Sequence, residues 1–173
     1  CFPGTDRSWV VMRNHESHEG SPVDAALGFA DDRGGGVTRL VVDRASGTLR
    51  ASKFVLTGTS RNCAGGPSPY GWLSCEEVDE SGHGFVFLCD VSASELQAPH
   101  RLPALGRFSH EAAAFDAKTG ITYLTEDTSD SAIYRHVPNH TTQPFVGGEL
   151  QALTVSGKDR FMLSEGRKVD EAF

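Results

Sequence analysis

The sequence of 173 residues lacks the features that mark membrane, disordered and nucleic-acid-binding proteins. It contains no apolar run of the roughly 18 residues that a membrane-spanning helix needs. Its net charge of −7 argues against a general nucleic-acid binder, because such proteins neutralise phosphates with lysine and arginine. Aromatic and β-branched residues occur throughout, which argues against long disorder. The first residues have neither a basic region nor an apolar core, so we expect no signal peptide in them.

Several common catalytic and metal-binding motifs are also missing. No pair of cysteines forms CxxC, so a zinc ribbon or a thioredoxin motif is not supported. There is no GxSxG nucleophile elbow and no Walker A ending. His15 and His18 are three residues apart, which differs from HExxH. The four cysteines are Cys1, Cys63, Cys75 and Cys89.

Short strands separated by tight turns dominate what is present. Phe85, Phe87 and Cys89 alternate along residues 84–91, which predicts a strand with Cys89 in the core. Only residues 93–98 resemble a single helical turn, so we expect an all-β fold. Further strands are expected at residues 9–12, 36–43, 52–57, 72–77, 111–116, 121–125, 132–137, 150–155 and 160–163.

Glycines that close tight turns recur at regular intervals. Gly47, Gly82, Gly120 and Gly157 are separated by 35, 38 and 37 residues. This spacing is typical of the blades of a β-propeller, although regular hairpins also suit a β-sandwich. A closed propeller needs at least four blades of about forty residues. The length of the chain therefore predicts that residues 1–173 form an incomplete portion of one propeller domain, about three to four blades, with no second domain.

Small acidic groups lie at the ends of expected strands. Alternation along a strand places the first and third residues of a three-residue group on one face. The inner ends of propeller strands converge on an axis, where cations would offset the repulsion between carboxylates. Calcium favours oxygen ligands, whereas a thiolate favours softer metals. The alternative is that these residues are solvated surface groups. The groups are residues 14–16, 75–77, 110–111 and 125–127.

Residues 58–71 form a segment rich in glycine and proline, immediately before the second acidic group. Such segments allow a backbone to approach a ligand closely when they form loops. Arg61 and Asn62 lie within it. Their side chains would either donate hydrogen bonds to an oxyanion or brace the loop.

Taken in order, these segments resemble the PhoX-type alkaline phosphatase family. The resemblance covers residues 9–138, and the ordered series is far more specific than any single segment. The segment before Cys75 is one residue shorter than in the family. The matching segments are WVVMRNHE at residues 9–16, GGGVTRL at 34–40, GTSRNCAGG at 58–66, SPYGWLSCEE at 68–77, GRFSHE at 106–111, YLTED at 123–127 and YRHVP at 134–138.

The resemblance implies a six-bladed β-propeller with iron and calcium at its axis, which hydrolyses phosphate monoesters. It implies Cys75 as the thiolate ligand of iron, and Asn62, with Arg61, as residues that orient the phosphate. It also implies a periplasmic or secreted protein, and further C-terminal blades that complete the site. The carboxylate ligands that it implies are Glu16, Glu76, Glu77, Glu111, Glu126 and Asp127.

Two other functions stay open. One is a non-catalytic propeller module that binds calcium or another ligand. The other is a different metal-dependent propeller hydrolase, such as a lactonase. The Cys-Glu-Glu sequence favours the phosphatase, because a site that holds calcium alone does not need a thiolate.

Overall fold

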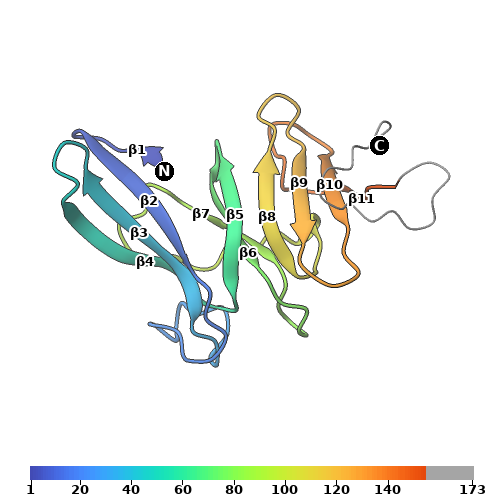
Figure 1. Cartoon of the computed structure of the whole chain (residues 1–173), viewed down its shortest axis with the longest axis horizontal. Coiled ribbons are helices and arrows are strands. Elements are labelled where there is room, and N and C mark those ends of the chain that lie inside the picture. Colours follow the sequence, from blue (N-terminus) through green and yellow to red (C-terminus); the bar gives the residue numbers. More distant parts are fainter. Residues whose placement is uncertain (155–173) are drawn as a thin grey trace.

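The computed structural model describes residues 1–154 of the chain (Figure 1). These residues form strands in three antiparallel sheets, ordered β1-β2-β3-β4, β5-β6-β7 and β11-β10-β9-β8. The all-β expectation is thus confirmed. In this part of the chain no helix is long and apolar enough to span a membrane. The elements are β1 (Phe2–Pro3), β2 (Ser8–His15), β3 (Gly35–Asp43), β4 (Leu49–Thr59), β5 (Asn62–Ser68), β6 (Gly71–Glu76), β7 (Val86–Cys89), the 3-10 helix η1 (Pro103–Leu105), β8 (His110–Phe115), β9 (Thr122–Glu126), β10 (Ile133–Pro138) and β11 (Gly148–Ala152).

Each expected strand that begins before residue 155 overlaps an observed one. The strand expected at residues 160–163 lies outside the described residues. Two expectations were wrong. Residues 93–98 form no helical turn, and residues 62–68 form strand β5 instead of a loop.

The tight turns predicted from aspartate and glycine are present where the structure describes them. Gly47 has a φ of 70°, in the left-handed region that glycine adopts without strain. Its N–H donates to the carbonyl of Asp43 at 3.0 Å. Backbone N–H groups of Ser46 and Ala45 bond the Asp43 carboxylate and lower its pKa to about 2. Gly157 lies outside the described residues.

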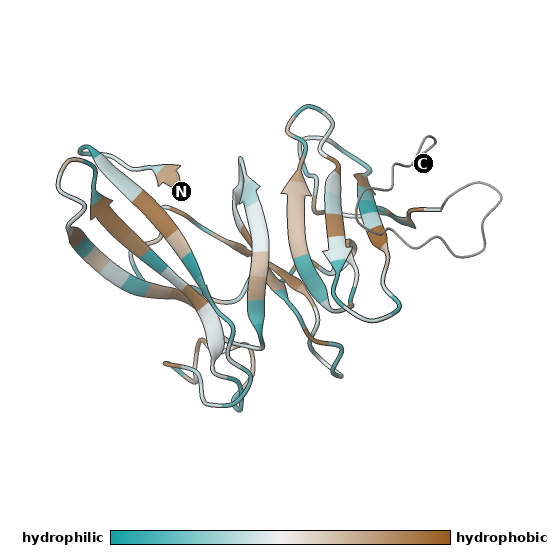
Figure 2. Cartoon of the chain, viewed as in Figure 1, coloured by the Kyte–Doolittle hydropathy of each residue, from teal (hydrophilic) through white to brown (hydrophobic). Residues whose placement is uncertain are grey.

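Two apolar clusters join neighbouring sheets. The first packs β2, β3 and β4 against β7 and includes the predicted core residue Cys89, which is 4% exposed. The second packs β6 and β7 against β8, β9 and η1. The middle sheet therefore has a core on each of its faces. The lower ends of β5 and β8 are hydrophilic (Figure 2), and the candidate site lies there.

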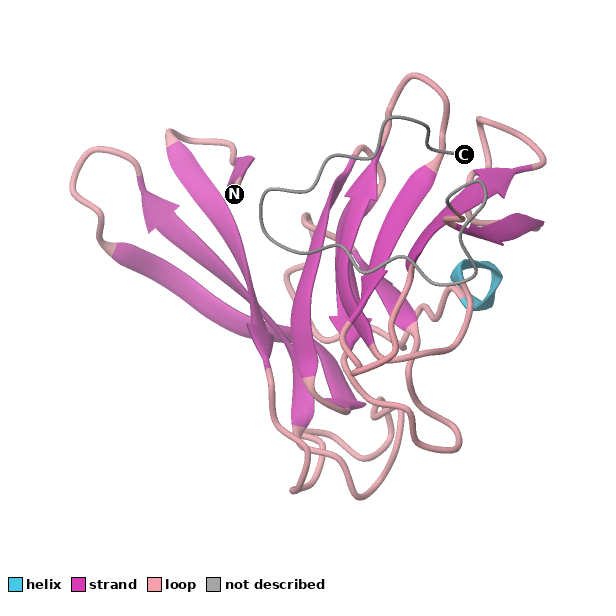
Figure 3. Ribbon diagram, turned by 45° about the vertical axis from the view of Figure 1, so that its right-hand side comes forward, coloured by secondary structure: helices cyan, strands magenta, loops and turns pink. Residues whose placement is uncertain are grey.

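Strand β5 runs between the first sheet and the β8–β11 sheet in both ribbon views (Figures 1 and 3). Its approach to β8 depends on glycine. A Cβ atom at Gly66 would lie 1.9 Å from the carbonyl oxygen of Ala113, so no other residue fits there without displacing a strand. The close contact brings the starts of β5 and β8 together, which positions their polar side chains for a shared site.

Candidate metal centre

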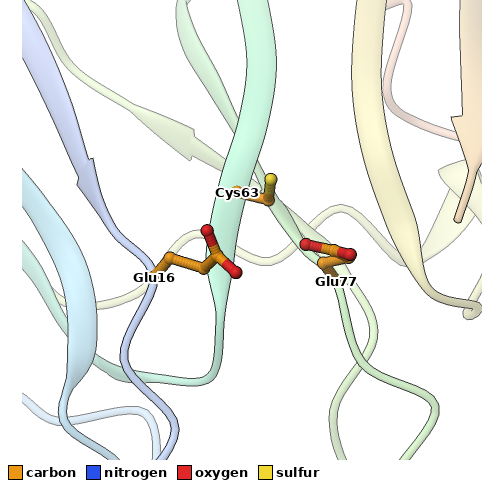
Figure 4. Close-up of side chains that lie close together, drawn as sticks. All are labelled: Glu16, Cys63 and Glu77. Atoms are coloured by element: carbon orange, nitrogen blue, oxygen red, sulfur yellow. The ribbon is translucent and has the colours of Figure 1, made fainter.

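Five acidic or thiol side chains gather where strands of the three sheets begin or end. They form two overlapping groups within the described residues, and the ligand atoms of each group lie within 4.8 Å of one another. Glu77 belongs to both. Figure 4 shows the side chains of the first group around one space. The first group is Glu16, Cys63 and Glu77, and the second is Glu77, Glu111 and Asp127.

Backbone hydrogen bonds hold the segments of this site together. Arg61, which has a φ of 46°, lies in the turn between β4 and β5. Its N–H donates to the carbonyl of Ser17 at 2.9 Å, and its carbonyl accepts from the N–H of Glu77 at 3.0 Å. Arg61 therefore links the segment after β2 to the segment after β6. The N–H of Asp127 donates to Ser109 at 3.0 Å, which fixes that carboxylate beside the start of β8.

A β-bulge in β5 presents Cys63. Asn62 pairs with Glu76 and Gly65 pairs with Ser74, with an irregularity between these pairs. Two residues of β5 thus oppose a single residue of β6. A bulge of this kind changes the direction of a side chain at the edge of a site.

The Asn14 side chain holds this bulge in place. Its amide nitrogen donates to the carbonyls of Cys63 and Ala64. Its oxygen accepts hydrogen bonds from Trp72 Nε1 at 2.9 Å and from Ser74 Oγ at 3.1 Å. The nitrogen of the Asn14 amide therefore binds β5, which carries the Cys63 thiol, and its oxygen binds the neighbouring strand β6.

The acidic groups of the site disfavour each other's charged forms. Burial is the main cause that raises the pKa of Glu77. A hydrogen bond from Cys63 opposes this shift, whereas Asp127 and Glu111 add to it. Burial, followed by Glu77 and Glu111, raises the pKa of Cys63 to about 12. A bound cation reverses these effects, because it stabilises both carboxylate and thiolate. The donor set fits metal ions, since carboxylates suit hard cations and a thiolate suits a softer one.

Four of the predicted carboxylates, namely Glu16, Glu77, Glu111 and Asp127, lie in the two groups. Glu76 and Glu126 do not. The Glu76 carboxylate is fully buried and accepts hydrogen bonds from residues on the other side of β6. Glu126 accepts hydrogen bonds from the hydroxyl of Tyr134 at 2.9 Å and from the N–H of Ala132 at 3.2 Å.

The thiol in the first group belongs to Cys63, whereas Cys75 is packed in the second apolar cluster and is 0% exposed. Sequence reasoning missed Cys63 because its segment was interpreted as a loop. The signal available was its place inside the GTSRNCAGG segment, which had already been matched to the family.

Asn62 and Arg61 have different surroundings. Asn62 is 0% exposed, and its amide nitrogen donates to Ser74 Oγ at 3.0 Å. Of the two roles considered for it, the structure favours bracing the turn. Arg61 is exposed, and among the described residues its guanidinium makes no hydrogen bond or ion pair.

Comparisons with known proteins agree with the resemblance found in the sequence. The family model described as alkaline phosphatase PhoX matches residues 44–166. No curated protein matched the chain, and no solved structure matched it either. The matched range covers more than half of the chain and contains Cys63, Glu77, Glu111 and Asp127. The chain therefore belongs to the PhoX alkaline phosphatase family.

Proposed function

We propose that this chain forms part of a metal-dependent phosphatase that hydrolyses phosphate monoesters. The observation that carries the proposal is the convergence of four carboxylates and one thiol from three sheets. Membership of the PhoX family supports it. A net-negative protein would otherwise repel a phosphate monoester. Cations at this site would make the local electrostatic potential positive.

Iron and calcium are the proposed metals. Cys63, with Glu16 and Glu77, is the donor set for iron, because thiolate is the softest ligand in the site. Glu77, Glu111 and Asp127 offer only carboxylate oxygens, which suits calcium. When bound, such ions neutralise phosphate charge and stabilise the attacking and leaving oxygens. Arg61 is exposed, and its backbone carbonyl accepts from the N–H of Glu77. Its guanidinium is proposed to pair with phosphate oxygens.

The proposed architecture is a portion of a six-bladed β-propeller. Three antiparallel sheets in succession, with β5 packed between the first sheet and β8, support it. Further blades of the same propeller remain the proposed partner that completes the site. A periplasmic or secreted location also stays a prediction.

A calcium-binding module without phosphatase activity is the second candidate. The second group favours it, because three carboxylates without a thiol resemble an all-oxygen calcium site.

Metal analysis and hydrolysis of p-nitrophenyl phosphate by the full-length protein distinguish these functions. We expect iron and calcium together with activity, and loss of both iron and activity in Cys63→Ala. Cys89→Ala is the matched control, because Cys89 lies in the other apolar cluster. Calcium alone with no hydrolysis would support the binding module. Loss of iron in Cys75→Ala but not in Cys63→Ala would overturn the assignment of the thiolate.

A further inference from the structure

Cys63 and Cys75 occupy opposed stretches of the neighbouring strands β5 and β6. The register pairs Asn62 with Glu76 and Gly65 with Ser74, so Cys75 lies opposite the bulge that contains Cys63. Opposed residues of antiparallel strands have Cα atoms about 4.5–5.5 Å apart. Disulfides span Cα distances of about 4.4–6.8 Å. Both cysteines are free in the structure.

The two thiols share part of their electrostatic surroundings. Burial is the main cause that raises the pKa of each thiol, and Glu111 adds to both shifts. The Cys63 thiol also contributes to the shift of Cys75. By contrast, burial alone raises the pKa of Cys89, which has no such neighbour.

The two cysteines differ in accessibility. Cys63 is half-buried beside Glu16 and Glu77, whereas Cys75 is fully buried behind it. A small oxidant therefore meets Cys63 first. The Asn14 amide donates to the carbonyl of Cys63, which holds the backbone of the bulge in place beside β6.

We propose that Cys63 and Cys75 are a site of oxidative modification, at which a peroxide forms a disulfide and withdraws Cys63 from the metal-binding group. Hydrogen peroxide transfers one oxygen to the Cys63 sulfur, giving a sulfenic acid and one water. The Cys75 sulfur then displaces that oxygen, which leaves as a second water with the Cys75 proton. Two thiols are oxidised to one disulfide, and one peroxide is reduced to two waters.

The effect on metal binding rests on the proposed function, whereas the disulfide itself does not. A sulfur that is bonded to Cys75 cannot be a thiolate ligand. Oxidation would therefore remove the only soft donor of the first group and leave the all-carboxylate group unchanged.

Peptide mapping without reduction tests the disulfide. The purified full-length protein is treated with hydrogen peroxide and digested, and we expect a Cys63–Cys75 cross-linked peptide that dithiothreitol cleaves. Cys89→Ala should keep this peptide. Cys75→Ala should lose it and accumulate sulfinic acid at Cys63. Sulfinic acid at Cys63 in the unmodified sequence, or a disulfide with Cys1 or Cys89, would overturn the proposal.

A chromophoric chelator measures iron released during the same oxidation. We expect release that follows disulfide formation, and rebinding after dithiothreitol and iron are added. A disulfide in a protein that never held iron would refute the proposed iron site and leave the disulfide standing. An iron-loaded protein that forms no disulfide would refute the modification and leave the proposed function standing.

Discussion

Replacing Glu76 with alanine is expected to destabilise the fold without removing a metal ligand. The Glu76 carboxylate is fully buried. It accepts hydrogen bonds from the N–H groups of Ser60 at 2.9 Å, Gly84 at 2.9 Å and Phe85 at 3.1 Å. His83 Nδ1 donates to it at 2.8 Å. The carboxylate thus ties the β4–β5 turn to the segment that leads into β7.

The size of the effect follows from the donors that the change leaves without acceptors. A buried donor without a partner costs about 1–3 kcal/mol, and the change removes the acceptor of four donors. These costs overlap, and water entering the space would satisfy part of the loss. We therefore expect Glu76→Ala to lower the free energy of unfolding by about 3–5 kcal/mol, out of the roughly 5–15 kcal/mol of a typical domain.

Urea denaturation, followed by tryptophan fluorescence, measures this loss as a shift in midpoint at constant m-value. Glu95→Ala is the matched control, because Glu95 is exposed, and it should change the free energy by less than about 0.5 kcal/mol. Metal content per folded molecule should be the same in both variants. A Glu76→Ala protein as stable as the control, but depleted of metal, would refute the reasoning and make Glu76 a ligand.

Three further predictions concern the framework of the site. Gly66→Ala should destabilise the protein by more than Gly47→Ala, because its Cβ would meet Ala113 at 1.9 Å whereas nothing lies within 4 Å at Gly47. The left-handed backbone at Gly47 costs an alanine about 1–2 kcal/mol. A larger drop in melting temperature for Gly47→Ala than for Gly66→Ala would contradict this prediction. Asn14→Ala should weaken metal binding about 10–100-fold, as loss of a supporting hydrogen bond does, and an unchanged affinity in a chelator competition would count against it. Burial lowers the pKa of His136, so the unfolded state takes up its proton first and stability should fall as the pH drops below about 6.5. In His136→Gln the unfolding free energy should fall less steeply with decreasing pH. Equal slopes of unfolding free energy against pH in the two proteins would disprove the role of His136.

The strand pattern was visible in the sequence except at the two-residue strand β1 and at β5. Glycine and proline are depleted in strands, so a segment containing Gly65, Gly66 and Pro67 was interpreted as a loop. In the structure Gly66 has a packing role, because the absence of a side chain lets β5 contact the backbone of Ala113 in β8. A contact between strands that are far apart in the sequence leaves no local periodic signal. Composition alone therefore could not separate a tightly packed strand from a loop.

Alternation along the strands separates the two carboxylates of each neighbouring pair. It places Glu77 and Glu76 on opposite faces, and the structure puts only Glu77 in the candidate site. The same holds at the end of β9, where Asp127 lies in the site and Glu126 accepts hydrogen bonds elsewhere. Alternation could not identify the thiol, because Cys63 lies in a bulge where two residues oppose one. That bulge is held by Asn14, which is 49 residues away in the sequence.

The identity of the cysteine in the first group determines which sheets the candidate site connects. With Cys63 in place of Cys75, the first group joins Glu16 of the first sheet to two residues of the middle sheet, and the second group joins Glu77 to the third sheet. Each group therefore draws donors from two sheets, in addition to the apolar packing and the hydrogen bonds that already join them. The neighbouring acidic groups raise the pKa of Glu77, which means that their charges oppose this arrangement. Cations bound at the proposed site would convert the same repulsion into a link between sheets, so we expect metal binding to stabilise the packing of the three sheets.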